Sequence, residues 1–382
     1  MSIHKPIYLD NAASTPIDGK VRKELVLSLG LFGNPSSFNN KGREARKVVE
    51  SARLKIARFL GAHAQEVIFT SSGTEANNLA IKGLGLKGDI ITTPIEHPSV
   101  LQAIKKSDLK ATHLKVDKDG FVSPEELKGQ LNKNTVLVSV MYANNEMGTV
   151  EPIIKLSKVI KEFRQKTSRP YPIFHVDACQ AAGYLDMNVD RLGVDMLVFN
   201  GTKIYGPKGI AVLYKRRGVK LNPEIVGGDQ ELGLRAGTEN LSAILGLAKA
   251  VEIIKKDEGK KTSKLRDYFI DQLKAKLPEA VLNGPTGSLR LPNNVSISIP
   301  DLSSEIILLE LDKHGIHAGS GSACTARSVE PSHVLKAIGV SPKYINGTIR
   351  FSLGRQTTKK EIDYVLEVLP KVIKDLKKRY GK

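Results

Sequence analysis

The alternation of short apolar segments with longer amphipathic ones constrains this chain most. Strand-like segments that are rich in β-branched and aliphatic residues occupy 66–70, 89–93, 112–116, 135–141, 173–177, 195–199 and 209–214. Helical periodicity fills the intervals at 43–60, 74–83, 97–106, 123–131 and 152–166. Strands that are apolar on both faces are typical of a parallel sheet covered by helices on each side. We therefore predict an α/β domain with a mostly parallel seven-stranded sheet.

The pattern changes near residue 240 and predicts a second, smaller α+β domain. Long helices are expected at 241–256 and 262–277, followed by a strand at 293–299 and a helix at 303–314. A Gly/Ser loop at 319–322 precedes a strand at 347–353 and a terminal helix at 359–379. We place the large domain at 16–255 and build the small domain from 1–15 and 256–382.

Composition excludes several classes of protein. Two cysteines in 382 residues cannot form a disulfide framework or a cysteine-rich zinc module, and we expect no metal site. No apolar stretch approaches about 18 residues, and the first residues lack the pattern of a signal peptide. We therefore expect a cytoplasmic protein without a membrane span. The net charge of 58 − 40 = +18 fits nucleic-acid binding, but equally a lysine-rich surface for acidic partners.

One glycine motif is misleading. Residues 83–88 (GLGLKG) match the dinucleotide-binding pattern G-x-G-x-x-G. That pattern binds a pyrophosphate only where a strand precedes it and a helix follows. Here the order is reversed, so we interpret the segment as a helix-to-strand loop.

Three polar segments at strand ends are candidates for chemistry. Gly73 and Thr74 follow a strand and open a helix, where free backbone N–H groups bind a phosphate; an ordinary helix cap explains them as well. Asp177 ends a strand, where it is either a ligand-binding carboxylate or a capping residue. Lys203 lies in a Gly/Pro loop and is a candidate Schiff-base lysine, or one of many surface lysines.

Taken together with His97, these segments fit one cofactor, pyridoxal 5'-phosphate. Its chemistry requires a lysine that holds it covalently and a carboxylate that keeps its pyridine nitrogen protonated. It also requires a phosphate site, and it gains from an aromatic group stacked on the ring.

The sequence resembles the cysteine desulfurases of the group I (NifS/IscS-like) branch, which are fold-type I pyridoxal-phosphate enzymes of the class V aminotransferase superfamily. The resemblance rests on residues 8–16 (YLDNAASTP), 33–37 (GNPSS), 96–97 (EH), 143–148 (ANNEMG), 177–180 (DACQ), 203–209 (KIYGPKG), 235–238 (RAGT), 319–325 (GSGSACT) and 350–355 (RFSLGR). These motifs span nearly the whole chain. They imply a homodimer that passes sulfur from L-cysteine to an iron–sulfur scaffold or another acceptor protein, including for tRNA thiolation.

The resemblance assigns roles around the cofactor ring. Lys203 matches the Schiff-base lysine, and Asp177 matches the partner of the pyridine nitrogen. Gln180 matches the group near the ring hydroxyl, and His97 the histidine stacked on the ring, with a further role in proton handling. Asn145 matches the asparagine near the ring oxygen and the substrate.

Further matches concern the phosphate. Gly73 and Thr74 match the phosphate turn, and Thr238 matches a phosphate contact from the other subunit of the dimer. Asn200 and Thr202 stand where many members have Ser-Gly-His, and because both side chains are hydrogen-bond donors we expect phosphate binding with altered affinity. Cys179 replaces a threonine of many members, and we interpret it as a packing residue.

The resemblance identifies Cys324, in the small-domain segment 319–332, as the nucleophile. The Gly/Ser residues before it are typical of a loop that delivers a catalytic group, and Arg327 favours the thiolate form. Arg350 matches the arginine that binds the substrate carboxylate. The implied reaction transfers the sulfur of L-cysteine to Cys324 as a persulfide and releases L-alanine.

Two other interpretations remain. A selenocysteine lyase or another class V aminotransferase would share Asp177 and Lys203, but an aminotransferase has no need of Cys324. A basic nucleic-acid-binding or scaffold protein would explain the charge of +18. The complete set of cofactor motifs argues against this second interpretation, and we expect no nucleic-acid partner.

Overall fold

The computed structural model describes residues 6–255, 257–321 and 331–380. Its centre is a seven-stranded sheet with the order β2-β8-β7-β6-β5-β3-β4. The five neighbouring strands β4, β3, β5, β6 and β7 run parallel to one another. Strand β8 is antiparallel to both β2 and β7. The strands are β2 (Val67–Thr70), β3 (Gly88–Thr92), β4 (Leu109–His113), β5 (Thr135–Ser139), β6 (Ile173–Asp177), β7 (Met196–Asn200) and β8 (Ala211–Lys215). The predicted fold class, with a mostly parallel seven-stranded sheet, is confirmed.

One predicted strand is misplaced. The segment expected at 112–116 is β4 at Leu109–His113, on the edge of the sheet. Lys110 and His113 are exposed there, because an edge strand has no neighbour on one side. The apolar signal on which the prediction relied therefore belongs to buried residues that follow the strand, such as Leu114.

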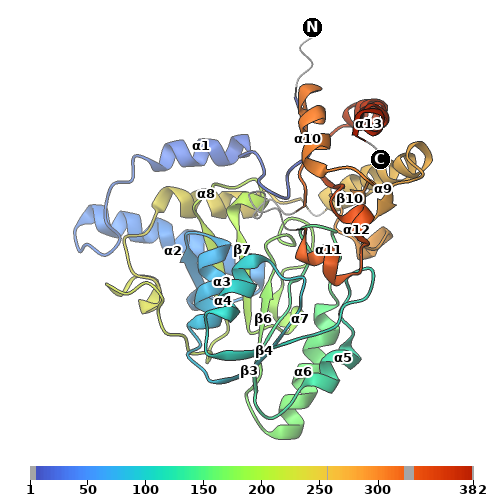
Figure 1. Cartoon of the computed structure of the whole chain (residues 1–382). Coiled ribbons are helices and arrows are strands. Elements are labelled where there is room, and N and C mark those ends of the chain that lie inside the picture. Colours follow the sequence, from blue (N-terminus) through green and yellow to red (C-terminus); the bar gives the residue numbers. More distant parts are fainter. Residues whose placement is uncertain (1–5, 256, 322–330, 381–382) are drawn as a thin grey trace.

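Helices cover both faces of the sheet (Figure 1). On β2, Val67 and Phe69 join one apolar cluster and Ile68 joins another, because successive strand residues point to opposite faces. The first cluster includes residues of α2, α6 and α8, and the second includes residues of α3 and α4. The helices of this part are α1 (Gly19–Ser28), α2 (Asn40–Leu60), α3 (Gly73–Lys82), α4 (Pro98–Lys105), α5 (Pro124–Gln130), α6 (Ile153–Thr167), α7 (Val189–Leu192) and α8 (Leu241–Glu252). The sequence did not indicate α1 or α7.

A third apolar cluster belongs to the C-terminal part, at the upper right of Figure 1. Its sheet has the antiparallel order β12-β10-β9. Ile7 and Leu9 pack into this cluster, because β1 pairs with β11. The elements are β1 (Ile7–Tyr8), α9 (Glu258–Lys276), β9 (Val281–Leu282), β10 (Asn294–Ser298), α10 (Ser304–Lys313), β11 (Ile316–His317), α11 (His333–Ala337), α12 (Pro342–Ile345), β12 (Thr348–Ser352) and α13 (Lys359–Tyr380). The domain boundaries at 16–255 and 256–382 stay a prediction.

The topology brings several chain segments to one edge of the main sheet. The carboxyl ends of β6 and β7 lie beside the beginning of α3, and the loop after β3 leads into α4. In open α/β sheets, ligands bind at this edge. The segment at 83–88 joins the end of α3 to the start of β3, as predicted for a helix-to-strand loop. None of the described helices is both long and apolar enough to cross a membrane.

Candidate active site

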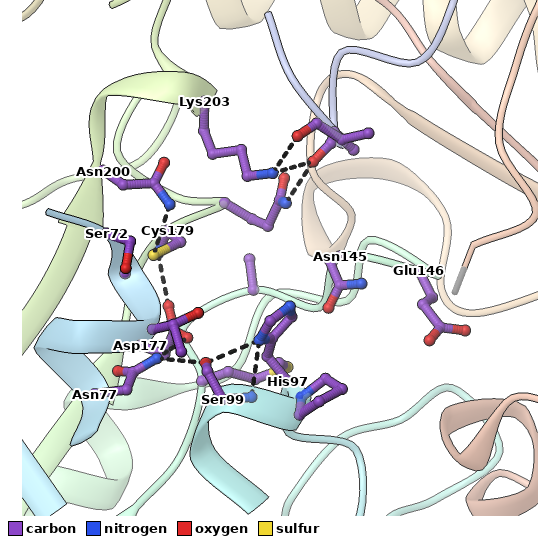
Figure 2. A pocket seen from close by; sticks show the side chains of 18 of the residues that line it. Ser72, Asn77, His97, Ser99, Asn145, Glu146, Asp177, Cys179, Asn200 and Lys203 are labelled. Carbon is purple, nitrogen blue, oxygen red and sulfur yellow. Dashed lines mark hydrogen bonds between the residues drawn. The ribbon is translucent and has the colours of Figure 1, made fainter. Parts of the chain in front are cut away.

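A pocket of about 300 Å³ opens at this edge of the sheet (Figure 2). Sequence-predicted residues from six separate chain segments line it. They are Gly73, Thr74, His97, Asn145, Asp177, Gln180, Asn200, Lys203 and Arg350. The structure therefore brings most of the predicted site residues around one cavity.

Lys203 enters the pocket from a short 3₁₀ turn, η2 (Gly201–Lys203), directly after β7. Its Nζ donates hydrogen bonds to the carbonyl oxygens of Ala12, at 2.8 Å, and Ala13, at 2.6 Å. Gln180 donates to the same carbonyl of Ala12 through Nε2, at 3.0 Å. The N-terminal segment thus holds the lysine amine and Gln180 together, although its own contribution is backbone only.

Asp177 is buried at the end of β6, and its carboxylate is held by two donors. Oδ2 accepts from Nδ2 of Asn77, and Oδ1 accepts from the backbone N–H of Cys179, both at 2.9 Å. Hydrogen bonds to a carboxylate fix its orientation. Burial and the nearby Asp177 raise the pKa of the Cys179 thiol well above its usual range, so this cysteine remains neutral.

His97 caps the N-terminus of α4 with its ring. Nδ1 accepts from the backbone N–H of Ser99 at 3.1 Å and lies 2.8 Å from Oγ of Ser99. Burial lowers the pKa of His97, with Asp177 opposing the shift and Lys203 and His333 adding to it. The ring is therefore neutral at physiological pH.

The end of the pocket formed by α3 has the features of a phosphate site. Gly73 opens the helix, and a Cβ atom at this position would lie 3.0 Å from Sγ of Cys179 and 3.2 Å from Nδ2 of Asn200. A Cβ would therefore crowd both side chains, whereas glycine leaves this space open. Thr202 does not line the pocket, but its Oγ1 donates to Oδ1 of Asn200 at 3.0 Å and orients that amide.

Arg350 lies on β12, at the opposite side of the pocket, and its side chain is only 2% exposed. Nη1 donates to the carbonyl oxygens of Asn145, at 2.9 Å, and Gly321, at 3.0 Å. Nη2 is paired with Oδ1 of Asp10 at 2.8 Å. Nε has no hydrogen-bond partner among the described residues. The guanidinium is thus fixed by the protein while one buried donor is still available.

Two predicted residues lie elsewhere. Thr238 is exposed in the single chain and does not line the pocket. Cys324 lies outside the described residues, between Gly321 and Ser332, which both approach Glu146. Oγ of Ser332 donates to Oε2 of Glu146 at 2.6 Å, and a Cβ on Gly321 would lie 3.3 Å from the same oxygen. Burial raises the pKa of Glu146.

The sequence analysis missed five pocket residues that contact the predicted ones: Ala12, Ala13, Asn77, Ser99 and Glu146. Asn77 follows Gly73 by one helical turn, so it lies on the same face of α3. That spacing is the signal that could have identified it. Ser99 follows His97 by two residues, which is the usual spacing for a helix cap.

The residues present fit pyridoxal 5'-phosphate. A primary amine, a buried carboxylate and a neutral imidazole surround one cavity, and a glycine at a helix N-terminus provides the close approach that a phosphate requires. Lys203, Asp177 and His97 would hold the ring, and Gly73, Thr74 and Asn200 would hold the phosphate. Arg350, which lines the same cavity, supplies the positive charge that matches a carboxylate on a bound amino acid.

Comparisons with known proteins agree with this chemistry. The family model "Aminotransferase class-V" matches residues 7–365. The cysteine desulfurase IscS of Dictyoglomus turgidum is 47% identical, covering 98% of this chain and 96% of the relative. A cysteine desulfurase of Trichormus azollae is 45% identical, with 97% and 94% coverage.

Solved structures give the same result. A NifS-like protein superposes with a TM-score of 0.89 at 35% identity, covering 97% of this chain and all of that one. SspA in complex with cysteine has a TM-score of 0.78 at 33% identity, with 92% and 100% coverage.

Proposed function

The chain belongs to the aminotransferase class-V family and, within it, to the cysteine desulfurases, and we propose that it converts L-cysteine to L-alanine and passes the sulfur on through Cys324. The observation that carries this proposal is the single cavity lined by Lys203, Asp177, His97 and Arg350. A lysine, a carboxylate and an arginine around one pocket suit an α-amino acid bound to pyridoxal phosphate. The cysteine complex of the related SspA supports cysteine as the amino acid.

Each residue of the pocket has a role that follows from its geometry. When bound, pyridoxal phosphate stabilises negative charge at the α-carbon of an amino acid. Asp177, held by Asn77 and the Cys179 N–H, would keep a proton on the pyridine nitrogen. Arg350 would bind the substrate carboxylate through the positive charge and the N–H donors of its guanidinium. Lys203 would give up its hydrogen bonds with Ala12 and Ala13 when it binds the cofactor. Its amine would also take up the proton of the α-carbon.

Cys324 would then take the sulfur. Its thiolate forms an S–S bond with the substrate sulfur while the C–S bond breaks, and the electron pair of that bond stays with the carbon. Protonation of that carbon gives alanine, and a persulfide remains on Cys324. A persulfide is a reversible modification of cysteine, so the sulfur can pass to an iron–sulfur scaffold or another acceptor protein.

A homodimer in the cytoplasm completes the proposal. Large apolar side chains are unusually exposed in the single chain, among them Leu29 at 73%, Phe32 at 77%, Phe38 at 93% and Val226 at 79%. Exposed apolar surface of this kind marks protein–protein contact sites. A dimer formed there would let the exposed Thr238 reach the phosphate of the neighbouring subunit. Light scattering of the purified protein measures the oligomeric state directly.

The test is to incubate the pure protein with L-cysteine and to measure sulfide and alanine together, with and without a reductant. The wild-type protein is expected to give both products in equal amounts when a reductant releases the persulfide. Selenocysteine, tested in parallel, measures the preference between the two substrates. Absence of alanine in both incubations would contradict the proposal.

Cys324→Ser isolates the sulfur-transfer step. This variant is expected to keep its cofactor and its visible absorbance but to release no sulfide, because a hydroxyl cannot accept the sulfur atom. Cys179→Ala, the matched control, is expected to keep releasing sulfide, because its buried and neutral thiol is not a nucleophile. Normal sulfide release by Cys324→Ser would refute the assignment of the nucleophile.

A further inference from the structure

Four side chains form a continuous hydrogen-bonded row along one wall of the pocket (Figure 2). Nδ2 of Asn77 donates both to Oδ2 of Asp177 and to Oγ of Ser99, each at 2.9 Å. Oγ of Ser99 in turn lies 2.8 Å from Nδ1 of His97. Asn77 is only 1% exposed and Ser99 only 7% exposed. The row therefore joins Asp177 to His97 with little access for water.

The direction of each hydrogen bond in this row follows from the chemistry of its members. Asp177 is an acceptor, so the Asn77 amide must turn its nitrogen toward it; the opposite orientation would place two oxygen atoms against each other. The nitrogen carries two hydrogens, and the second one points to Ser99. Because Oγ of Ser99 accepts there, its single hydrogen is available for Nδ1 of His97.

The backbone also donates a hydrogen bond to Nδ1 of the His97 ring. The N–H of Ser99 donates to Nδ1 at 3.1 Å, as part of the cap of α4. An N–H cannot become an acceptor, so a hydrogen on Nδ1 would face it directly. Two donors thus converge on Nδ1, and the proton of the neutral ring belongs on Nε2.

We propose that Asn77 and Ser99 are positioning residues that hold His97 as the Nε2–H tautomer, so that His97 donates a hydrogen bond into the pocket and does not act as a general base. The proposal rests on the proposed function, because it concerns the same pocket. A base needs a lone pair on the atom that faces the substrate, and the lone pair of this ring is on Nδ1, directed at Ser99. Another group of the pocket must therefore remove the α-proton. Lys203, whose amine lines the pocket, is that group.

The tautomer can be observed directly in the full-length protein with bound cofactor. Selective ¹⁵N labelling of histidine distinguishes a protonated from an unprotonated ring nitrogen by chemical shift, and the spectrum of His97→Gln identifies the signals of His97. The expected result is a protonated Nε2 and an unprotonated Nδ1 at neutral pH. A proton on Nδ1, or on both nitrogens, would overturn the proposal. This measurement does not depend on turnover, so it stands even if the protein makes no alanine from cysteine.

Ser99→Ala tests the positioning role. Loss of the hydroxyl donor is expected to shift the Nδ1 resonance and to raise the pKa of His97, because that donor stabilises the neutral ring. The titratable groups that face the ring, Asp177, Lys203 and His333, are the same in both proteins. Ser99→Thr is expected to restore the wild-type values. Ser123→Ala, which removes a serine cap from α5, is the matched control and should leave His97 unchanged. A His97 signal that is identical in Ser99→Ala and wild type would contradict the proposal.

Variants of His97 itself separate a donor from a base. The amide nitrogen of glutamine can replace Nε2–H as a donor but cannot accept a proton. His97→Gln is therefore expected to exceed His97→Ala in kcat by roughly fivefold or more, the effect of one hydrogen bond. Equal losses in the two variants would contradict the role of Nε2–H as a hydrogen-bond donor.

Discussion

The two walls of the pocket are built differently. The cofactor wall comprises Asn77, His97, Ser99, Asp177 and Lys203. The substrate wall comprises Arg350 and the groups around it, which are Asp10, Asn145, Glu146 and His333. The residues of the cofactor wall lie at the ends of strands of the main sheet and at the starts of the helices that follow them. The substrate wall joins β12 to the N-terminal segment, the loop after β5 and the start of α11.

Their hydrogen bonding differs as well. On the cofactor wall, the row from Asp177 through Asn77 and Ser99 to Nδ1 of His97 has a fixed hydrogen-bond direction. Oδ1 of Asn77 is the one buried atom of this row without a partner among the described residues. On the substrate wall, Arg350 keeps a buried Nε without a described partner, and burial raises the pKa of Glu146. A cofactor stays bound through many turnovers, so its wall can be preorganised. A wall that binds and releases a charged substrate must keep some of its hydrogen-bonding capacity for the ligand.

Asp177→Asn should have the largest effect, because it removes the charge on which the cofactor wall is organised. We expect kcat to fall on the order of 10²- to 10³-fold, the usual effect of losing one preorganised electrostatic group. The cofactor should remain bound through Lys203 and the phosphate site. Steady-state kinetics and the visible spectrum measure the two quantities.

Asp195→Asn is the matched control for this prediction. Asp195 is also buried, but it lies before β7 at the opposite end of the sheet, where its Oδ2 accepts from the Phe174 N–H at 2.8 Å. This variant should lose stability and keep the kcat of the loaded enzyme. If kcat of Asp177→Asn stays within about tenfold of wild type, the cofactor wall does not depend on this charge.

Arg350→Lys tests the substrate wall and should have an intermediate effect. A lysine cannot replace the contacts to Asn145, Gly321 and Asp10 and also bind a carboxylate, because it is a single point charge. We expect kcat/KM for L-cysteine to fall roughly ten- to a hundredfold, mainly through KM.

The methyl ester of cysteine sharpens this prediction, since it has no carboxylate. For the ester, Arg350→Lys and wild type should have similar KM values. Arg290→Lys is the matched control, because Arg290 is equally buried but does not line the pocket. An unchanged KM for L-cysteine in Arg350→Lys would show that the substrate carboxylate binds elsewhere.

The same two walls explain what the sequence could predict. Asp177 and Lys203 follow apolar strands directly, so local pattern locates them at the carboxyl edge of a parallel sheet. The pairing of Arg350 with Asp10 joins residues that are 340 positions apart, and no local pattern encodes it. Ala12 and Ala13 hold Lys203 through backbone oxygens, which leave no trace in side-chain chemistry. The chemical groups of both walls were therefore largely predictable, whereas the contacts that hold them, such as those of Asn77 and Ser99, required the structure.

Glu96 lies where the two walls meet, and its ionisation is expected to affect stability and not turnover. It directly precedes His97, and its backbone oxygen lies 2.9 Å from Nε2 of His333. Oε1 accepts from Thr93 Oγ1 at 2.8 Å and from the Met141 N–H at 2.9 Å, whereas Oε2 has no partner among the described residues. Burial raises the pKa of Glu96 from 4.5 to about 8, and the nearby Asp177 adds to the shift.

This shift makes stability depend on pH. Between 4.5 and about 8 the unfolded chain releases the proton of Glu96 while the folded chain keeps it. The free energy of unfolding therefore falls as pH rises through this window, by on the order of a few kcal/mol for this one group. Glu96→Gln removes the proton exchange, so its stability should decline less steeply than that of wild type, whatever its absolute value. Urea unfolding of the cofactor-loaded proteins at several pH values measures both slopes.

The exposed Glu162 on α6 provides the control, since Glu162→Gln should keep the slope of the wild type. The buried Glu146 and Glu151, whose pKa values burial also raises, remain in every variant. The difference between Glu96→Gln and wild type therefore isolates one proton. Equal slopes would mean that Glu96 is already ionised in the folded protein. A second negative charge would then lie near Asp177, and the two walls would be electrostatically coupled and not independent.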